Sequence, residues 1–526
     1  MSLNPALPFA RQARDNPDRL ALWVAGLEIT YSELAGLAGR AARWLRLAAR
    51  PPSRVVVFAS GSVEAYAGML AAWWTGAAWI PLSPRTPGQR LASALEILSA
   101  DALILDEAAA GLLGPDLIAR CPERILALGH ARAPAGLDAP GRAAAAARDD
   151  LPPLEEVSAP EPVGDDELAY VMFTSGTTGI PKGVMVSAAN LVHFRSCLEE
   201  RYRIGRDDRV AQSSELTFDL SLLGLLLAWG AGACLCVVPE TQRMGPARFI
   251  RERRLSVWVS VPSTIACMRS MKMLPPGAFP LLRYSLFVGE PLTVASAAEW
   301  QAAAPVSVVD NLYGPTEATV VCLGQRFCDS SPITRGRATV AIGAPFRGTE
   351  AAIVDGELRF LPAGDEGELV LSGPQLARGY LGDPAQTSAR FPTIGGRTWY
   401  RTGDLAYRDL GGAFHHLGRM DHQVKVLGNR IELEDVEAHL RAVCGCDLVA
   451  AVAWPLEEGS ARGIVAFVSG TTRSSREIAE GMRRRVPAYM VPSRVEHVES
   501  LPLGATGKID RAALARRLEK SAPGRS

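Results

Sequence analysis

The strongest constraint on the fold is a repeated alternation of short apolar runs with longer segments of helical periodicity. From residue 54 the chain reads RVVVFAS, SVEAYAGMLAAWW, AWIPL, TPGQRLASALEILSA and ALILD. Short runs rich in β-branched and apolar residues are typical of buried strands, and the amphipathic segments between them are typical of helices. This alternation predicts a parallel sheet that is covered by helices on both faces.

A second series of the same kind begins near Leu168. It contains the strand-like runs LAYVMFTS, RVAQSS, CLCVVP, VWVSVP and YSLFVGE, and helices are expected after Ser187, through Leu227 and at Arg248. Residues 131–166 separate the two series and are rich in Ala, Pro and acidic residues. We expect that segment to be a surface linker.

The sequence pattern changes again in the C-terminal third of the chain. After Gly336, Gly and Pro punctuate short strands such as EAAIVDGELRFL and GELVLSG, and a compact α+β pattern begins near Asp421. A chain of 526 residues is too long for one core. We therefore expect an α/β protein with two parts. Residues 1–420 form a large domain with doubly wound sheets and a β-rich subdomain, and residues 421–526 form a small mobile α+β lid.

Composition excludes several classes of protein. Lys+Arg and Asp+Glu both number 56, and this balance argues against a nucleic-acid partner. The N-terminus has no basic and apolar leader, and Gly interrupts apolar stretches such as LLGLLLAWGAGACLCVV, so we expect a cytoplasmic protein without a membrane partner. Cys234/Cys236 and Cys444/Cys446 lack nearby His residues, which favours reduced thiols over a metal site.

One loop carries the first chemical signal. In YVMFTSGTTGIPKGVMV, residues 170–186, two apolar runs flank a segment of hydroxyl-bearing residues and glycines that ends near a lysine. Hydroxyls, accessible backbone N–H groups and a mobile positive charge suit a phosphate group. The loop lacks the Gly-Lys-Ser/Thr ending of a Walker A motif, and a plain hairpin turn is the alternative. The residues concerned are Thr174, Ser175, Gly176, Thr177, Thr178, Gly179 and Lys182.

This loop resembles the phosphate loop of the adenylate-forming enzymes, which include acyl-CoA synthetases, luciferases and the amino-acid adenylation domains of nonribosomal peptide synthesis. The resemblance covers nearly the whole chain, and its motifs follow the order of the family. They are ITYSEL from Ile29, WTGAAWIPLSP from Trp74, FDLS from Phe218, NLYGPTE from Asn311, GELVLSGPQLARGYL from Gly367, YRTGDL from Tyr400, GRMDHQVKVLGNRIELEDVE from Gly418, PAYMVP from Pro487 and TGKIDR from Thr506.

The resemblance implies that a carboxylate oxygen attacks the α-phosphorus of ATP and expels pyrophosphate. The protein then mainly aligns and neutralises anions. Glu317 is implied as a Mg²⁺ ligand, Thr316 as a contact of the α-phosphate, and Lys508 as the cation between the carboxylate and ATP. From residue type and position alone, a surface lysine is by far the favoured interpretation of Lys508, and its catalytic role comes only from the resemblance.

The resemblance also implies a set of adenosine contacts. Tyr313 stacks on adenine, Asn311 reads its amino edge, and Asp404 and Arg419 bind the ribose. Asp404 is alternatively an Asx-turn residue, because Gly-Asp is a common turn pair. His416 occupies a position where the family usually has an aromatic residue, and it adds a titratable ring. Gly289 and Glu290, at the end of YSLFVGE, complete the implied nucleotide site.

The identity of the activated acid depends first on Asp219 in FDLS. In amino-acid-activating members of the family this Asp pairs with the substrate's α-ammonium, whereas capping of the following helix by Asp219 or Ser221 is the local alternative. The remaining lining carries no acid, base or aromatic ring, so it predicts an apolar substrate. The resemblance implies that this lining comprises Leu220, Leu223, Ser260, Leu286, Val288, Leu312, Val320 and Val321 and that it is closed by Lys508.

This lining is most similar to that of stand-alone prolyl-activating members, so L-proline is the first expectation. Those members typically have Tyr where this chain has Ser260 and Ala where it has Val288. A branched aliphatic amino acid, alanine or an unusual cyclic imino acid therefore stays open.

The fate of the adenylate follows from the ends of the chain. No carrier-protein serine follows TGKIDR and no condensation domain precedes ITYSEL. We therefore expect a free-standing enzyme that passes its aminoacyl group to the phosphopantetheine thiol of a separate carrier protein. Asp421 is implied as the hinge between two conformations, although a solvated turn acid is an equal interpretation. The competing functions are an acyl-CoA synthetase and a non-catalytic binding protein on the same fold.

Overall fold

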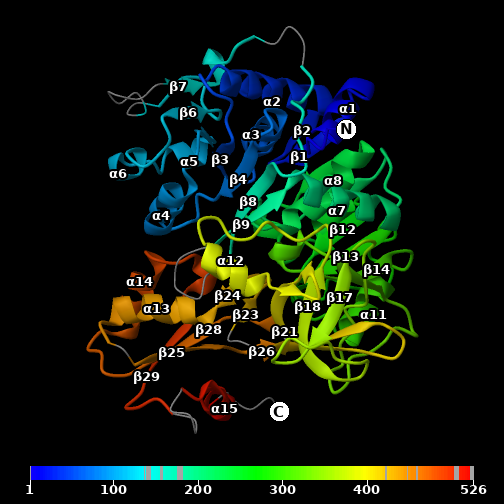
Figure 1. Cartoon of the computed structure of the whole chain (residues 1–526), viewed down its shortest axis with the longest axis vertical. Helices are drawn as coiled ribbons and strands as arrows, with labels where there is room; N and C mark the ends of the chain where they lie inside the picture. Colours follow the sequence, from blue (N-terminus) through cyan, green and yellow to red (C-terminus); the bar gives the residue numbers. More distant parts are fainter. Residues whose placement is uncertain are drawn as a thin grey trace. The chain divides into compact units, whose positions relative to one another are not determined.

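The protein is described by a computed structural model that covers residues 2–134, 137, 144–153, 158–174, 182–420, 423–446, 448–457, 460–502 and 509–521. Its chain divides into two compact units (Figure 1). The first comprises Met1–Pro84, Ala94–Phe173 and Gly183–Gly418, and the second comprises Arg85–Ser93, Thr174–Lys182 and Arg419–Ser526. The α/β fold class predicted from the sequence is confirmed, and a domain boundary at residues 420/421 stays a prediction.

The first strand–helix series forms a seven-stranded sheet. The strand pairings from β7 through β8 are parallel, as the alternation predicts. In spatial order the strands are β7 (Ala144–Ala147), β6 (Arg124–Ala127), β5 (Ala102–Leu105), β3 (Arg54–Phe58), β4 (Ala78–Leu82), β8 (Leu168–Thr174) and β9 (Lys182–Ser187). The intervening helices are α3 (Val63–Trp74), α4 (Gly88–Leu98), α5 (Glu107–Ala110) and α6 (Pro115–Ile118).

The expectation of a surface linker at residues 131–166 is wrong in one part. Ala144–Ala147 form the edge strand β7, which pairs in parallel with β6. Alanine has a weak preference for strands, so composition favoured a linker. An available sheet edge supplies the missing backbone hydrogen bonds, and this tertiary effect overrides the local preference.

The second series forms a nine-stranded sheet. In spatial order the strands are β16 (Ala344–Pro345), β15 (Leu323–Arg326), β14 (Val308–Tyr313), β13 (Tyr284–Val288), β12 (Val257–Ser260), β10 (Arg209–Gln212), β11 (Cys234–Val237), β1 (Leu20–Val24) and β2 (Leu27–Thr30). Its helices are α7 (Ala188–Arg201), α8 (Leu220–Ala231), α9 (Ala247–Glu252), α10 (Ser263–Ser270) and α11 (Val294–Ala303). The N-terminal hairpin joins this sheet, because β1 pairs in parallel with β11.

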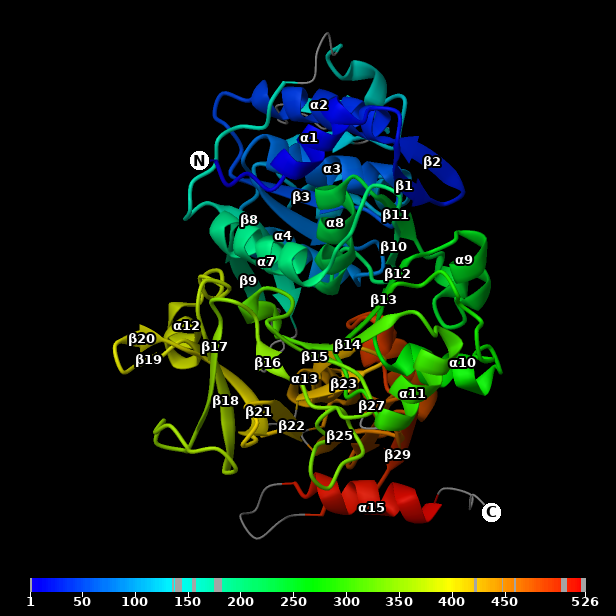
Figure 2. The same ribbon diagram turned by 90° about the vertical axis from the view of Figure 1, so that its right-hand side faces the viewer.

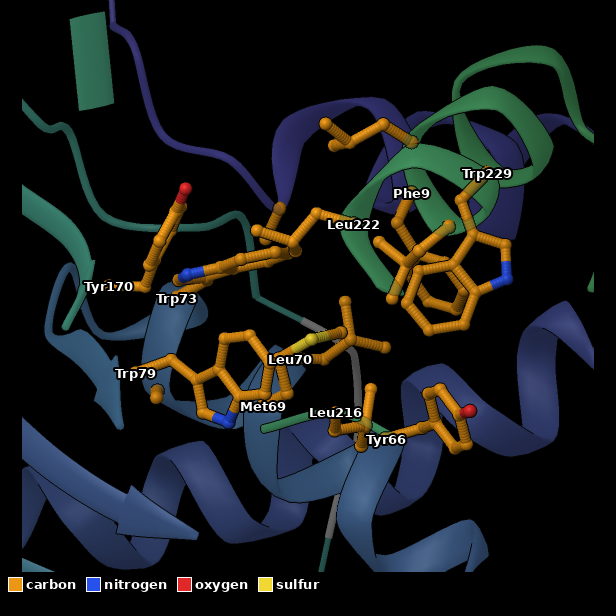
Figure 3. Packing of buried hydrophobic residues seen from close by; sticks show 14 of the residues in the cluster. Phe9, Tyr66, Met69, Leu70, Trp73, Trp79, Tyr170, Leu216, Leu222 and Trp229 are labelled. Carbon is orange, nitrogen blue, oxygen red and sulfur yellow. The ribbon is translucent and has the colours of Figure 1, made fainter. Parts of the chain in front are cut away.

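Helices belonging to the two sheets share one core. Side chains of α3 and α8 pack together with Phe9 of α1 (Leu7–Asp15) and with residues of β4 and β8 (Figures 2 and 3). Trp73 donates its indole N–H to Ala169 O at 2.8 Å, and Trp229 donates to Ala21 O at 3.0 Å. Each bond fixes a large buried ring to a strand. The helix α2 (Tyr31–Arg46) covers α3 and starts at a Thr30–Glu33 capping box.

The β-rich subdomain expected after Gly336 is present. It is a four-stranded sheet in the order β17 (Glu350–Val354), β18 (Glu366–Ser372), β21 (Tyr400–Arg408) and β22 (Phe414–Arg419). The strands β17, β18 and β21 pair in antiparallel fashion. Between β18 and β21 lie α12 (Pro384–Arg390) and the short hairpin β19 (Thr393–Ile394) and β20 (Arg397–Thr398).

The C-terminal part of the second unit has the compact α+β structure predicted from Asp421 onward. One sheet has the order β24 (Asn429–Glu432), β23 (Gln423–Val426), β27 (Ser460–Ala461) and β26 (Leu456–Glu457), and the other has the order β25 (Val449–Ala453), β28 (Ile464–Val468) and β29 (Arg494–His497). The helices are α13 (Leu433–Cys444), α14 (Ser475–Arg483) and α15 (Arg511–Ser521). Arg511 holds α15 to Glu437 of α13 at 2.7 Å.

The described residues include all nine cysteines and the apolar helices. All nine cysteines are free, and the Sγ atoms of the buried Cys234 and Cys236 lie 3.8 Å apart. Within the described ranges, every helix falls short of the length and apolarity that a membrane span requires.

Candidate active site

The apolar lining predicted from the sequence gathers at one edge of the nine-stranded sheet. Strands β12, β13 and β14 run parallel, so their carboxyl ends meet at the same edge, where open α/β sheets bind ligands. Val288 of β13 pairs with Leu312 of β14. One hydrophobic cluster contains Leu223, Leu286, Val288, Leu312, Val320 and Val321, with Leu220 packed against it. The structure thus places seven of the eight predicted lining residues in the main core cluster, which extends over both large sheets, and it pairs Val288 directly with Leu312.

Ser260, the eighth lining residue, ends β12 and is 2% exposed. Its hydroxyl accepts the indole N–H of Trp258 at 2.9 Å and donates to Val261 O at 3.2 Å. Both hydrogen-bonding functions of Ser260 are thus engaged within its own strand. Ser260 therefore contributes a small side chain whose hydroxyl is already hydrogen-bonded, at a position where a larger residue would occupy more volume.

Asp219 lies directly before α8 and is half-buried. It has right-handed helical backbone angles, and its side chain makes no capping hydrogen bond to the helix. Ser221 lies inside the first turn, and its buried hydroxyl has no hydrogen-bond partner among the described residues. The interpretation of Asp219 or Ser221 as a helix cap is therefore wrong. Desolvation and then the nearby Asp219 carboxylate raise the pKa of the buried Tyr170.

The loop between β14 and β15 carries two of the three predicted catalytic residues, Thr316 and Glu317, and two lining residues. Thr316 begins a short 3₁₀ turn, Thr316–Ala318, in which Glu317 is buried. Thr319 and Val320 follow with φ values of 55° and 68°. Two consecutive β-branched residues in the left-handed region are rare, and each costs on the order of 1–3 kcal/mol. Such strain persists only where surrounding contacts impose it.

Those contacts come from Gln375 and Tyr380, which the sequence analysis did not single out. Gln375 is 1% exposed, and its amide N–H groups donate to the carbonyls of Val321, Ala318 and Thr319 at 2.8, 3.2 and 3.3 Å. Tyr380 donates its hydroxyl to Glu317 Oε1 at 2.8 Å. Both residues lie in the motif GELVLSGPQLARGYL, and the polar side chains within that otherwise apolar motif were the available signal.

Asp404 is positioned by a bulge in β21 and not by a turn. The pairing of β18 with β21 shifts so that Glu368 faces Leu405 while Val370 faces Arg401, and Gly403 has a φ of 71° in the extra segment. Glycine is suited to this backbone because it has no Cβ. The Asx-turn interpretation of Asp404 is therefore wrong, and the bulge directs its carboxylate toward Tyr313 and His416.

Three predicted nucleotide contacts form one cluster around that carboxylate. The hydroxyl of Tyr313 donates to Asp404 Oδ2, and His416 Nε2 lies 3.2 Å from Asp404 Oδ1. The rings of Tyr313 and His416 are 6.1 Å apart with an interplanar angle of 39°. Asn311, on the same strand as Tyr313, donates its amide N–H groups to Ala341 O and Val340 O at 2.9 and 3.2 Å. This orientation assigns its amide oxygen as the acceptor for an amino group.

Other predicted nucleotide residues lie at element ends. Gly289 and Glu290 follow β13, and Glu290 Oε2 accepts the backbone N–H of Ser263 at 2.7 Å. Thr174 ends β8, Lys182 begins the neighbouring β9, and Arg419 ends β22. The loop of hydroxyls and glycines thus joins two neighbouring strands. Residues Ser175, Gly176, Thr177, Thr178, Gly179, Asp421 and Lys508 lie outside the described residues.

Comparison with known proteins identifies the family. The profile of the AMP-binding enzymes matches residues 9–381. The chain belongs to the AMP-binding enzyme family. This AMP-binding enzyme is 35% identical over 360 residues to the L-proline--[L-prolyl-carrier protein] ligase of Pseudomonas fluorescens, covering 67% of this chain and 69% of the relative. It is 37% identical over 372 residues to phosphinothricin tripeptide synthetase PhsC of Streptomyces viridochromogenes, covering 68% of this chain.

The enzyme spans about a third of the length of PhsC, since the match covers 32% of that relative. Among solved structures it resembles the Vibrio cholerae adenylation domain AlmE, which was determined in complex with glycyl-adenosine-5'-phosphate. The TM-score is 0.85 at 32% identity, and the match covers 98% of this chain and 97% of AlmE. The chain thus shares the fold of an adenylation domain over nearly its whole length.

Proposed function

We propose that this enzyme activates an apolar α-amino acid as its aminoacyl-AMP and transfers the aminoacyl group to the phosphopantetheine thiol of a separate carrier protein. One observation supports the amino acid in particular. Asp219 precedes a helix that it does not cap and adjoins a cluster of Leu and Val side chains. In amino-acid-activating members of the family the Asp of this motif pairs with the substrate's α-ammonium, and the half-buried Asp219 occupies that position.

The roles proposed for the other residues come from the family resemblance. Glu317 and Thr316 lie on one 3₁₀ turn, where the Glu317 carboxylate is proposed to bind Mg²⁺ and the Thr316 hydroxyl to contact the α-phosphate. When bound, Mg²⁺ neutralises negative charge on the phosphates. Asp404 offers carboxylate oxygens to the ribose hydroxyls. Lys508 is proposed to stabilise the charge that develops as the carboxylate attacks the α-phosphorus.

L-Proline is the first substrate that we propose. Support comes from the similarity to the prolyl-carrier protein ligase of P. fluorescens and from a lining of Leu and Val residues without a charged partner. AlmE was determined with a glycyl adenylate, so small amino acids belong in the same test. Ser260 and Val288 depart from the prolyl pattern, and together they redistribute the pocket volume.

Amino-acid-dependent ATP–pyrophosphate exchange tests this proposal. The panel contains the proteinogenic amino acids, D-alanine and pipecolate, each assayed without coenzyme A. A maximum at proline supports the whole proposal, and a maximum at glycine, alanine, valine or isoleucine keeps the mechanism but replaces the substrate. Exchange with plain carboxylic acids alone contradicts the role proposed for Asp219 and places the enzyme with the acyl-CoA synthetases.

A further inference from the structure

We infer that Gln375 is a positioning residue that sets amino-acid selectivity by holding the strained turn of Val320 and Val321. The inference rests on the proposed function, because it assigns a role within the same substrate site. Gln375 does not belong to the predicted lining. It acts on the substrate only through the backbone that carries two lining side chains.

The first step of the argument is the density of contacts between Gln375 and one short segment. Its amide group donates to three carbonyls between Ala318 and Val321, the shortest being 2.8 Å to Val321 O. In return, the hydroxyl of Thr319 donates to the backbone carbonyl of Gln375 at 2.6 Å. Both partners are buried, at 1% and 0% exposure, so neither side has water as an alternative partner.

The second step is the conformation that these bonds maintain. Thr319 and Val320 both have positive φ values, which β-branched residues adopt only under external constraint. A Cβ at Gly314 would lie 2.5 Å from Val321 Cα, so the backbone at Gly314 also packs directly against the turn. Gln375 and Gly314 thus both constrain the turn.

The third step separates selectivity from nucleotide binding. Glu317 has its own anchors on the Gln375–Tyr380 segment, namely the Tyr380 hydroxyl and the backbone N–H of Ala377 at 2.9 Å. The Asp404 cluster lies on β21, β22 and β14, and its hydrogen bonds join Asp404 to Tyr313 and His416. Loss of the Gln375 amide is therefore expected to move Val320 and Val321 while the nucleotide contacts stay in place.

The test compares three variants. Gln375→Met keeps the length of the side chain and removes its donors. Gln375→His restores one N–H donor. Thr349→Val is the matched control, because it removes the hydroxyl that contacts Gln375 Oε1 at 3.5 Å and leaves every bond to the turn. Pyrophosphate exchange gives kcat and KM for ATP, for the preferred acid and for an analogue that differs by one methylene.

For Gln375→Met we expect the KM of the preferred acid to rise about tenfold and its selectivity over the analogue to fall about tenfold, since one methylene is discriminated by roughly 10–200-fold in an apolar pocket. The KM for ATP should stay within about twofold of the wild-type value. Gln375→His should recover part of the selectivity, and Thr349→Val should match the wild type. A crystal structure of Gln375→Met should show negative φ values at residues 319 and 320.

Equal losses for all acids and for ATP, unchanged selectivity, or retained positive φ values would overturn the inference. If Gln375→Met does not fold, selectivity measured on Gln375→His decides the question. Wild-type exchange with plain carboxylic acids alone would contradict the amino-acid proposal. In that case the Gln375 test runs unchanged on those acids, so the two failures are distinguishable.

Discussion

Asp219 shows how a single side chain separates two interpretations that local sequence leaves equal. An acidic residue before an apolar helix is a common N-cap, and only the observed backbone and hydrogen bonds exclude that role here. For Tyr380 and Gln375, by contrast, the local sequence provided no interpretation to choose between. Their roles depend on partners about 55 to 65 residues away, so no pattern in the local sequence could assign them.

Replacing Asp219 by Asn should lower kcat/KM for the amino acid by about 10²–10³-fold, because removing one member of a desolvated charge pair costs about 3–5 kcal/mol. The KM for ATP should not change. Pyrophosphate exchange measures both quantities. Ser221→Ala is the matched control on the same helix end, since its buried hydroxyl has no hydrogen-bond partner within the described part of the chain. A similar loss in both variants would contradict a specific role for Asp219.

Replacing Tyr380 by Phe removes the hydroxyl that orients Glu317. Hydrogen bonds to charged groups contribute about 1.5–3 kcal/mol, so we expect the half-saturating Mg²⁺ concentration to rise about tenfold. The thermal shift induced by Mg²⁺ with ATP should shrink in parallel, which gives a readout besides activity. Phe391→Leu alters the ring packed against Tyr380 at 6.0 Å and serves as the control. An unchanged Mg²⁺ dependence in Tyr380→Phe would refute this role.

At the scale of elements, the β14–β15 hairpin is the feature that concentrates the site. Its two strands pair from Asp310↔Arg326 to Tyr313↔Leu323, and the loop between them holds Thr316, Glu317, Val320 and Val321. The loop closes tightly because Gly314 lies against the backbone of Val321. In NLYGPTE, the strand β14 thus ends at Tyr313, Gly314 makes the close backbone contact, and the 3₁₀ turn begins at Thr316.

Gly314→Ala should destabilise this hairpin by about 1–3 kcal/mol and lower activity, because the new Cβ would meet main-chain atoms 2.5 and 2.7 Å away that have little room to move. Gly36→Ala in α2 is the opposite case, since its Cβ meets nothing within 4 Å. That variant should gain up to about 1 kcal/mol from helix propensity. Thermal unfolding of both variants and the wild type shows whether each substitution lowers or raises the stability of the protein. Equal effects of the two substitutions would contradict the steric argument.

At the scale of the whole molecule, the chain is organised as two units, each with its own core. The large unit combines two mainly parallel sheets with the four-stranded sheet of the β-rich subdomain. The core of the C-terminal part of the second unit is formed by side chains of α13, β25 and β28. The family resemblance assigns Lys508 of the C-terminal segment to the adenylation step. That assignment stays a prediction, because Lys508 lies outside the described residues.

Lys508→Ala should reduce aminoacyl-adenylate formation by about 10²–10³-fold, as expected when one group that stabilises transition-state charge is removed. The melting temperature should stay at the wild-type value. Arg516→Ala, which removes an exposed cation of the same segment, should leave the rate unchanged. Burst measurement of adenylate formation tests the rate directly. A full rate in Lys508→Ala would exclude the proposed catalytic role, and a large fall in melting temperature would instead indicate a structural one.

The sequence by itself determined the strand and helix series, the α/β class and the family, because apolar periodicity and ordered motifs are properties of local sequence. The apolar lining was supplied by the family resemblance, and the ends of the neighbouring parallel strands that carry part of it lie at one edge of the sheet. Only the tertiary structure decided that Ala144–Ala147 form an edge strand and that β1 joins the second sheet. The same holds for the bulge that carries Asp404 and for the amide of Gln375 that holds the pocket turn. Each of these features depends on hydrogen bonds between segments that are distant in the sequence. Such bonds do not produce a periodic pattern in the amino-acid sequence.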